Sequence, residues 1–73
     1  MRTWERDIYY IEEEAFDYSL HKFVVYTHDG DVIAEIVPNS IEDMEVVIAD
    51  LNNGADVHGW ENGQGETIVI PGR

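Results

Sequence analysis

The 73-residue sequence has no cysteine, only four lysine or arginine residues, two prolines and no apolar run longer than four residues. Without cysteine, neither a disulfide framework nor a thiolate zinc site can form. The short apolar runs exclude a membrane-spanning helix, and residues 1–6 lead into no apolar signal region, so a cytoplasmic location is expected. Four dispersed cations cannot build a basic face for nucleic acid.

Acidic residues are abundant. Sixteen Asp and Glu give a formal net charge of -12, yet 44% of the residues are hydrophobic, with two Trp, four Tyr and two Phe. That apolar content is typical of a folded domain and not of a disordered acidic segment. A chain of this length has room for one modest core, so residues 1–73 are expected to form a single domain.

Two strands and a tight turn are predicted in the centre of the chain. Residues 21–27 and 32–37 are rich in β-branched and aromatic side chains. Asp29 and Gly30 lie between them, and an Asp-Gly pair favours a hairpin turn because the turn needs positive φ. Pro38 ends the second strand, since it cannot donate a hydrogen bond to a sheet.

A helix is predicted from Ile41 to Asn52. Ser40 is a typical N-cap whose hydroxyl accepts from the N–H of Asp43, and the Asp43 side chain is expected to reach back in a shortened capping box. Gly54 supplies a left-handed C-terminal cap. One stripe at helical spacing is apolar and is expected to face the core: Ile41, Met44, Val47, Ile48 and Leu51.

The two ends of the chain are less regular. Residues 7–13 favour a strand followed by a turn at residues 17–19, but apolar residues between 4 and 18 also fit a helical stripe, which leaves a helix as the alternative. Residues 66–70 predict a short final strand, ended by Pro71. The order β-β-β-α-β predicts an α+β domain: a small antiparallel sheet of three to four strands with one helix packed on one face.

No metal, cofactor or catalytic site is expected. Five residues have the spacing of an EF-hand calcium loop: Asp50, Asn52, Gly54, Asp56 and Glu61. That loop needs glycine where this chain has Ala55, and Gly54 brings no side-chain oxygen. The three histidines form no recognisable catalytic triad or ligand set. The sequence therefore predicts a protein that is not an enzyme.

The distribution of charge is the strongest functional signal. Between Phe23 and Gly72 the chain has ten acidic residues and no Lys or Arg. On the predicted helix, Glu42, Asp43 and Asp50 face outward and Glu45 lies at the flank. A rigid negative surface of this kind can imitate the phosphate backbone of nucleic acid and compete for a basic groove. The alternative is that the acidity serves only solubility.

Three more residues complete the predicted partner-binding set. Asp29 and Asp31 would extend the negative surface if the hairpin tip lies on the same side as the helix. Trp60 stands among glycines and polar residues and would be an apolar anchor in an interface. The alternative for Trp60 is that it caps one end of the sheet core.

Two stretches carry a family resemblance that covers about the last third of the chain. They are Ile41-Glu42-Asp43-Met44-Glu45 and the run from Leu51 to Gly65, in which a helix ending Leu-x-x-Gly precedes the loop Gly59-Trp60-Glu61-Asn62-Gly63-Gln64-Gly65. This pattern resembles small uncharacterised acidic proteins of phages and mobile elements of Gram-positive bacteria. Small acidic proteins of that origin include anti-restriction and anti-CRISPR inhibitors. The resemblance implies a protein that acts by binding, and it transfers no catalytic residue.

The sequence thus predicts an acidic, non-enzymatic interaction protein that binds a basic groove of a nucleic-acid-handling protein. The main alternative is a structural homodimer whose acidity is incidental. Its basis is that apolar residues occupy both faces of the central strands, since Phe23 and Val25 alternate with Val24 and Tyr26. A small enzyme or a calcium-binding domain is the third alternative.

Overall fold

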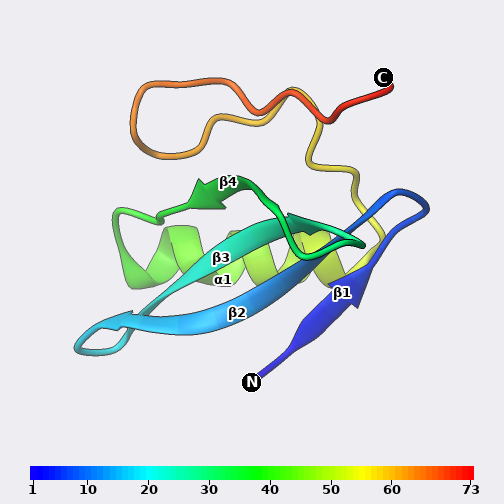
Figure 1. Ribbon diagram of the computed structural model, residues 1–73. Helices are drawn as coiled ribbons and strands as arrows, with labels where there is room; N and C mark the ends of the chain where they lie inside the picture. The colour runs from blue at the N-terminus through cyan, green and yellow to red at the C-terminus, as the bar shows by residue number, and fades with distance from the viewer.

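The computed structural model describes all residues from 1 to 73. Four strands precede a single helix: β1 (Thr3–Glu5), β2 (Tyr9–Asp17), β3 (Leu20–Thr27), β4 (Val32–Ile36) and α1 (Ile41–Asn52). Every neighbouring pair of strands is antiparallel, and the strands follow one another across the sheet in sequence order (Figure 1). The predicted α+β class, with a four-stranded antiparallel sheet and one helix, is confirmed.

The N-terminal elements differ in detail from the prediction. Residues 9–17 form a strand, so the helical alternative for residues 4–18 is wrong. This strand runs four residues past the predicted end at Glu13. The predicted turn follows it, where Tyr18 adopts a positive φ of 43°. β1 was not predicted, because a three-residue strand has too short a pattern and depends on pairing Trp4 with Ile11 of β2.

The strand predicted at residues 66–70 is wrong, and so is the order β-β-β-α-β. The backbone of this segment bonds to residues 58–62 and to no strand. Ile68 donates to the Trp60 carbonyl at 2.7 Å and accepts from Gly59 at 2.8 Å. Only one isolated bridge, between Glu61 and Thr67, results. The side chains nevertheless alternate as in a strand, since Ile68 and Ile70 are buried and Val69 between them is exposed.

Both ends of α1 lie where the sequence places them. The Ser40 hydroxyl accepts from the Asp43 N–H at 3.1 Å, but no bond returns from the Asp43 side chain, so only half of the predicted capping box forms. Gly54 has a φ of 86° and donates to the Leu51 carbonyl, as expected for the C-terminal cap. α1 lacks the length and the apolar character that a bilayer-crossing helix requires.

The hydrophobic core joins the sheet, the helix and the C-terminal segment. Leu51 belongs to it, and Met44, Val47 and Ile48 pack against it, whereas Ile41, predicted to face inward, is exposed. Ten buried residues make up the cluster: Trp4, Tyr9, Ile11, Phe23, Val25, Ile36, Leu51, Val57, Ile68 and Ile70.

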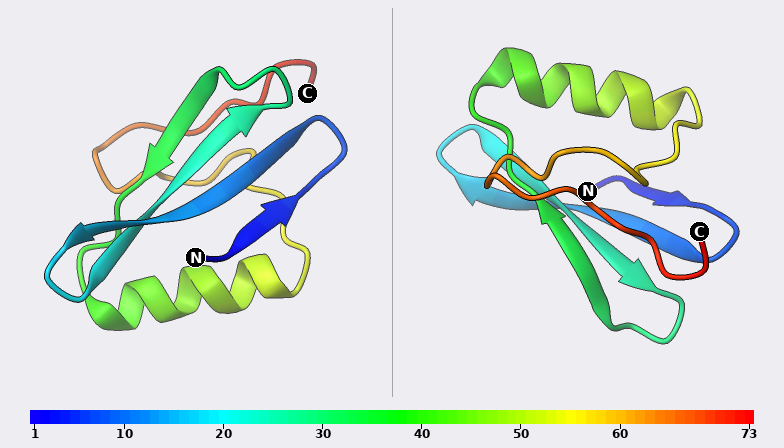
Figure 2. Two further views of the ribbon diagram at one scale, coloured as in Figure 1. Left: turned by 60° about the horizontal axis from the view of Figure 1, so that its bottom comes forward. Right: turned by 90° about the horizontal axis from the view of Figure 1, so that it is seen from above.

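The chain after α1 returns along the sheet without forming a strand. Figure 2 shows this segment running out to a turn and then back, so that the C-terminus lies toward the end of the molecule at which the chain leaves the helix, where Arg73 pairs with Asp56. It is fixed to β2 because Val57 donates to the Tyr9 hydroxyl at 3.0 Å, and it is fixed next to β4 because Val37 donates to the Asn62 carbonyl at 2.9 Å. Residues 61–69 therefore lie beside the end of β4.

Candidate interaction surfaces

All four cations of the protein are engaged within the chain. Three of them form ion pairs: Arg2 with Glu13 at 2.8 Å, Lys22 with Glu35 at 3.2 Å, and Arg73 with Asp7 at 2.9 Å and Asp56 at 3.4 Å. The fourth, Arg6, donates to backbone carbonyls of Glu5, Leu51 and Ala55. No cation is left to neutralise the rest of the surface.

Most carboxylates have no cationic partner. Of sixteen Asp and Glu side chains, only the four named above pair with Lys or Arg, which leaves twelve unpaired. The four carboxylates predicted on the helix belong to the unpaired set and are all exposed: Glu42, Asp43, Glu45 and Asp50. Because like charges repel, this surface favours any partner that supplies positive charge.

A groove borders the same helix. It has a volume of about 300 Å³ and runs between the first turns of α1 and the loop at Glu61. Its apolar lining includes Pro38, Val46 and Val47, and its carboxylates are Asp43 and Glu61. We call it the α1 groove. Val46 is 59% exposed, so the helix presents an apolar side chain between its carboxylates.

Glu61 was not among the predicted binding residues. It reaches α1 because Asn62 accepts from Val37, which holds the loop against the end of β4. Gly63 then packs so closely that a Cβ there would overlap the Val37 carbonyl oxygen. The run of glycines in the sequence indicated a loop, but nothing local indicated which part of the chain the loop would meet.

The hairpin tip and Trp60 are not part of this surface. Asp29 and Asp31 are exposed at the β3–β4 turn, and in both views of Figure 2 that turn lies on the far side of the molecule from α1. They therefore do not extend the helix surface. Trp60 is half-buried and packs against the hydrophobic core, as the core-cap alternative described.

The other face of the central strands carries a mixture of tyrosines and acids. Tyr10 and Tyr26 stack with ring centroids 5.1 Å apart. The Tyr26 hydroxyl donates to Glu14 at 3.0 Å, and this bond raises the pKa of Tyr26 to about 12. Val24, between Glu12 and Glu35 in register, is only 3% exposed. The aliphatic residue that β3 places on this face is therefore already buried within the single chain.

A buried acid, Glu13, lies in the middle of β2. The Glu13 side chain is 3% exposed and accepts from Arg2 Nε at 2.8 Å, while His21 Nδ1 lies 2.6 Å from its other oxygen. The hydrogen bond from Arg2 is the main cause that lowers the pKa of Glu13 to about 2, and the His21 contact adds to it. A carboxylate held between two basic groups is a structural clamp between β2, β3 and the N-terminus.

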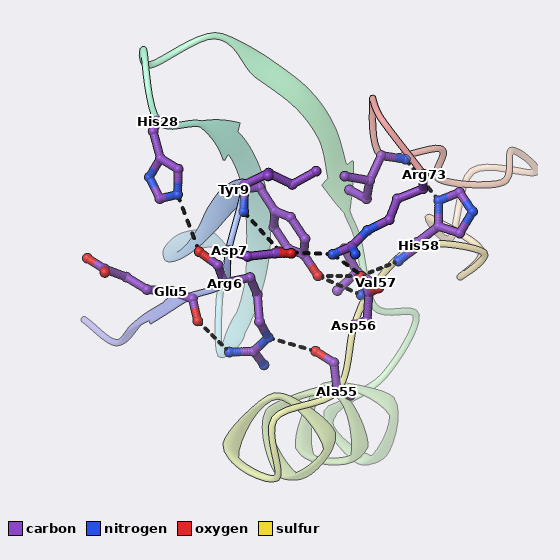
Figure 3. Close-up of polar contacts among 12 residues, drawn as sticks. Glu5, Arg6, Asp7, Tyr9, His28, Ala55, Asp56, Val57, His58 and Arg73 are labelled. Carbon is purple, nitrogen blue, oxygen red and sulfur yellow. Dashed lines mark hydrogen bonds and ion pairs between the residues drawn. The ribbon is translucent and has the colours of Figure 1, made fainter.

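A second network joins the C-terminal segment to β2 (Figure 3). The buried Tyr9 hydroxyl donates to Asp56 at 2.6 Å. That bond lowers the pKa of Asp56, while burial is the main cause that raises the pKa of Tyr9. His58 Nδ1 accepts from the Ile70 N–H at 3.1 Å. Asp56 and His58 are therefore both engaged in contacts that hold the C-terminal segment in place.

No group of three or more His, Asp and Glu side chains is arranged to hold a metal ion. Asp56, which the calcium-loop spacing included, is instead occupied by Tyr9 and Arg73. Comparison with protein-family models, with curated proteins and with solved structures finds no match to this chain.

Proposed function

We propose that this chain is a cytoplasmic, non-enzymatic interaction protein that binds a basic groove of a nucleic-acid-handling protein. The binding surface is the outer face of α1 together with the α1 groove. Its charged residues are Glu42, Asp43, Glu45, Asp50 and Glu61. In keeping with the resemblance noted in the sequence, we further propose that it acts as a phage-type inhibitor that competes with nucleic acid.

One observation carries this proposal. The surface around α1 has five exposed carboxylates with no Lys or Arg partner, because every cation of the protein is engaged elsewhere. A partner's Lys and Arg side chains would neutralise these charges and release the counterions that each surface holds. The same release of counterions stabilises the binding of proteins to the phosphates of DNA. This protein and DNA would therefore compete for the same basic groove of the partner.

The α1 groove adds a feature that suits Lys and Arg in particular. These side chains carry an apolar stem and a charged head, and they place the stem on apolar surface while the head stays polar. In the α1 groove, Val46 and Pro38 offer apolar surface beside the carboxylates of Asp43 and Glu61. A Lys or Arg side chain therefore suits this groove, with its stem on the apolar surface and its charged head beside the carboxylates.

The homodimer alternative has less support. It rested on apolar residues that one helix cannot cover. Val24, the aliphatic residue on the second face of β3, is already buried within the single chain, and Tyr26 stacks on Tyr10. These residues do not require a second copy for burial, and two copies at -12 each would repel one another. Dimerisation stays a prediction that light scattering at about a hundred micromolar would test.

The test uses two variants of equal net charge. One neutralises the helix with E42Q, D43N, E45Q and D50N. The other neutralises four exposed, unpaired carboxylates away from the helix with E5Q, D17N, D29N and D31N. Each variant and the parent protein are immobilised and exposed to a lysate of a Gram-positive bacterium. Bound protein is then eluted with either salt or duplex DNA.

We expect the parent and the off-helix variant to retain a basic protein that duplex DNA displaces, and the helix variant to lose it. Equal loss from both variants would show that only bulk charge matters. Retention by the helix variant, elution that is insensitive to DNA, or an empty eluate from the parent would each contradict the proposal.

A further inference from the structure

The exposed edge of β4 faces a second groove. β4 pairs with β3 on one side only, and its outer edge has no backbone partner; the first such bond on that side is made by Val37, which follows β4. The groove has a volume of about 550 Å³ and is lined by consecutive residues of two segments, 32–35 on β4 and 66–69 on the returning chain, together with Asn62 and Gln64. We call it the β4 groove.

The second wall of the β4 groove also has unused backbone groups. In residues 66–70, Ile68 uses both its N–H and its carbonyl in bonds to residues 59–60. Thr67 and Val69, which alternate with Ile68, make no backbone hydrogen bond. Because the side chains of Ile68 and Ile70 are buried, this segment is held in an extended form with one edge unpaired. Two incomplete edges thus border the same groove.

We propose that the β4 groove binds an extended peptide segment of a partner protein, which adds to the sheet as a strand next to β4. Main-chain hydrogen bonds to a free sheet edge provide affinity in this mode of recognition, and alternate side chains provide selectivity. Val32 and Val69 are 57% and 66% exposed at the groove and supply apolar contacts. The proposal extends the proposed function to another surface and does not depend on α1.

The charge of the groove determines the kind of peptide. Glu35 and Glu66 line it, and no Lys or Arg does; Glu35 is paired with Lys22, whereas Glu66 has no cationic partner. We therefore assign it a segment in which basic residues alternate with apolar ones. A second copy of this chain is a poor occupant, because each copy has a formal net charge of -12.

The test compares two synthetic peptides. The first is a blocked heptapeptide in which lysine alternates with valine. The second has the same side chains but an N-methyl group on alternate backbone nitrogens, which removes the donors while keeping the charge. Binding is followed by amide NMR shifts of the isotope-labelled protein. We expect shifts at residues 32–35 and 67–69, and affinity at least about tenfold lower for the methylated peptide, because two or more hydrogen bonds are lost.

Two variants separate this inference from the function proposed for α1. E66Q should weaken the unmethylated peptide by about threefold, and D17N, an equal change of charge outside the groove, should have less effect. The helix variant with four neutralised residues should show the same ratio of affinities for the unmethylated and methylated peptides as the parent protein. If the two peptides bind with equal affinity, the strand-addition proposal fails but the function proposed for α1 is unaffected. If the capture of a DNA-displaceable protein fails, the function proposed for α1 fails but the strand-addition proposal is unaffected.

Equal affinity for the two peptides, or shifts confined to α1, would overturn the assignment. Shifts at residues 32–35 that grow with protein concentration in the absence of peptide would also overturn it, because they would identify a second copy as the occupant.

Discussion

The guanidinium of Arg6 caps a helix that begins 35 positions further along the chain. Its Nη2 donates to the carbonyl of Leu51 and its Nε donates to the carbonyl of Ala55, both at 2.9 Å. α1 has no basic residue in its own last turn. Arg6 thus supplies the positive charge that the C-terminal end of a helix favours, and it adds a second donor to the Leu51 carbonyl, which also accepts from Gly54, and a donor to the Ala55 carbonyl just beyond the helix.

Replacing Arg6 by alanine should lower the free energy of unfolding by about 2 kcal/mol, since its charge-assisted hydrogen bonds to the carbonyls of Leu51 and Ala55 are lost. Urea unfolding followed by circular dichroism measures the change. R73A serves as the control, because it removes ion pairs to exposed carboxylates and should cost less than about 1 kcal/mol. Equal losses in the two variants would argue against a capping role for Arg6.

The buried Glu13 should control the acid stability of the protein. Its pKa is about 2 in the folded protein against an ordinary value of 4.5. A carboxyl with a lowered folded-state pKa stabilises the fold fully above its ordinary pKa, and this contribution disappears as the pH falls from about 4.5 towards about 2. E13Q should therefore lower stability by about 2 kcal/mol at pH 7, because hydrogen bonds to a charged group are lost.

Unfolding free energies measured between pH 7 and pH 2.5 check this expectation. The gap between the parent and E13Q should narrow as the pH falls below about 4.5, since the parent then loses the charge that the variant never had. A gap that stays constant over this range would show that the Glu13 charge does not stabilise the fold.

Two loop glycines with the same backbone conformation should respond differently to alanine. Gly63 and Gly65 have φ of 83° and 86°, so each substitution carries backbone strain of about 1 kcal/mol. At Gly63 the new Cβ would also overlap the Val37 carbonyl oxygen, whereas at Gly65 it meets no atom. We expect G63A to be clearly less stable in urea than G65A and to weaken the Val37–Asn62 hydrogen bond. Equal stability would mean that the contact is not maintained in solution.

Local signals account for the parts of the fold that the sequence predicts well. Asp29 and Gly30 fix the central hairpin, and Ser40 and Gly54 fix the two ends of α1. The failures involve long-range pairing. Residues 66–70 have strand composition, but their partners are in a glycine-rich loop that makes only one bridge, so composition alone could not reveal that no strand forms.

The same distinction holds for the candidate site. Helical periodicity places Glu42, Asp43 and Asp50 outside correctly, because the spacing of apolar residues determines which side is buried. Glu61 joins them only because the chain turns back at Asn62 and docks beside Val37. Asp29 was grouped with the helix because the sequence contains no information on how far the sheet separates its hairpin tip from α1.

The twelve unpaired carboxylates should make the protein more stable as salt increases from about 20 to 300 mM, because screening over roughly 10 Å relieves their repulsion. Every kcal/mol gained corresponds to about 4–8 °C in melting temperature for a domain of this size. Thermal unfolding monitored by circular dichroism measures the effect. A melting temperature that falls with salt would show that internal ion pairs outweigh the repulsion.

Asp43 and Asp50 separate this general repulsion from the effect of position on the helix. Both are exposed, and each can be neutralised without a change of shape by Asn. Asp43 lies in the first turn, where the helix dipole favours negative charge, whereas Asp50 lies near the end that disfavours it. At low salt D50N should therefore stabilise the protein by about 0.5 kcal/mol, and D43N should stabilise it less or destabilise it. The stability differences between each variant and the parent protein should both become smaller at 300 mM salt. If the two variants gain stability equally, bulk repulsion alone sets the stability, and the charges of α1 have no positional role in the fold.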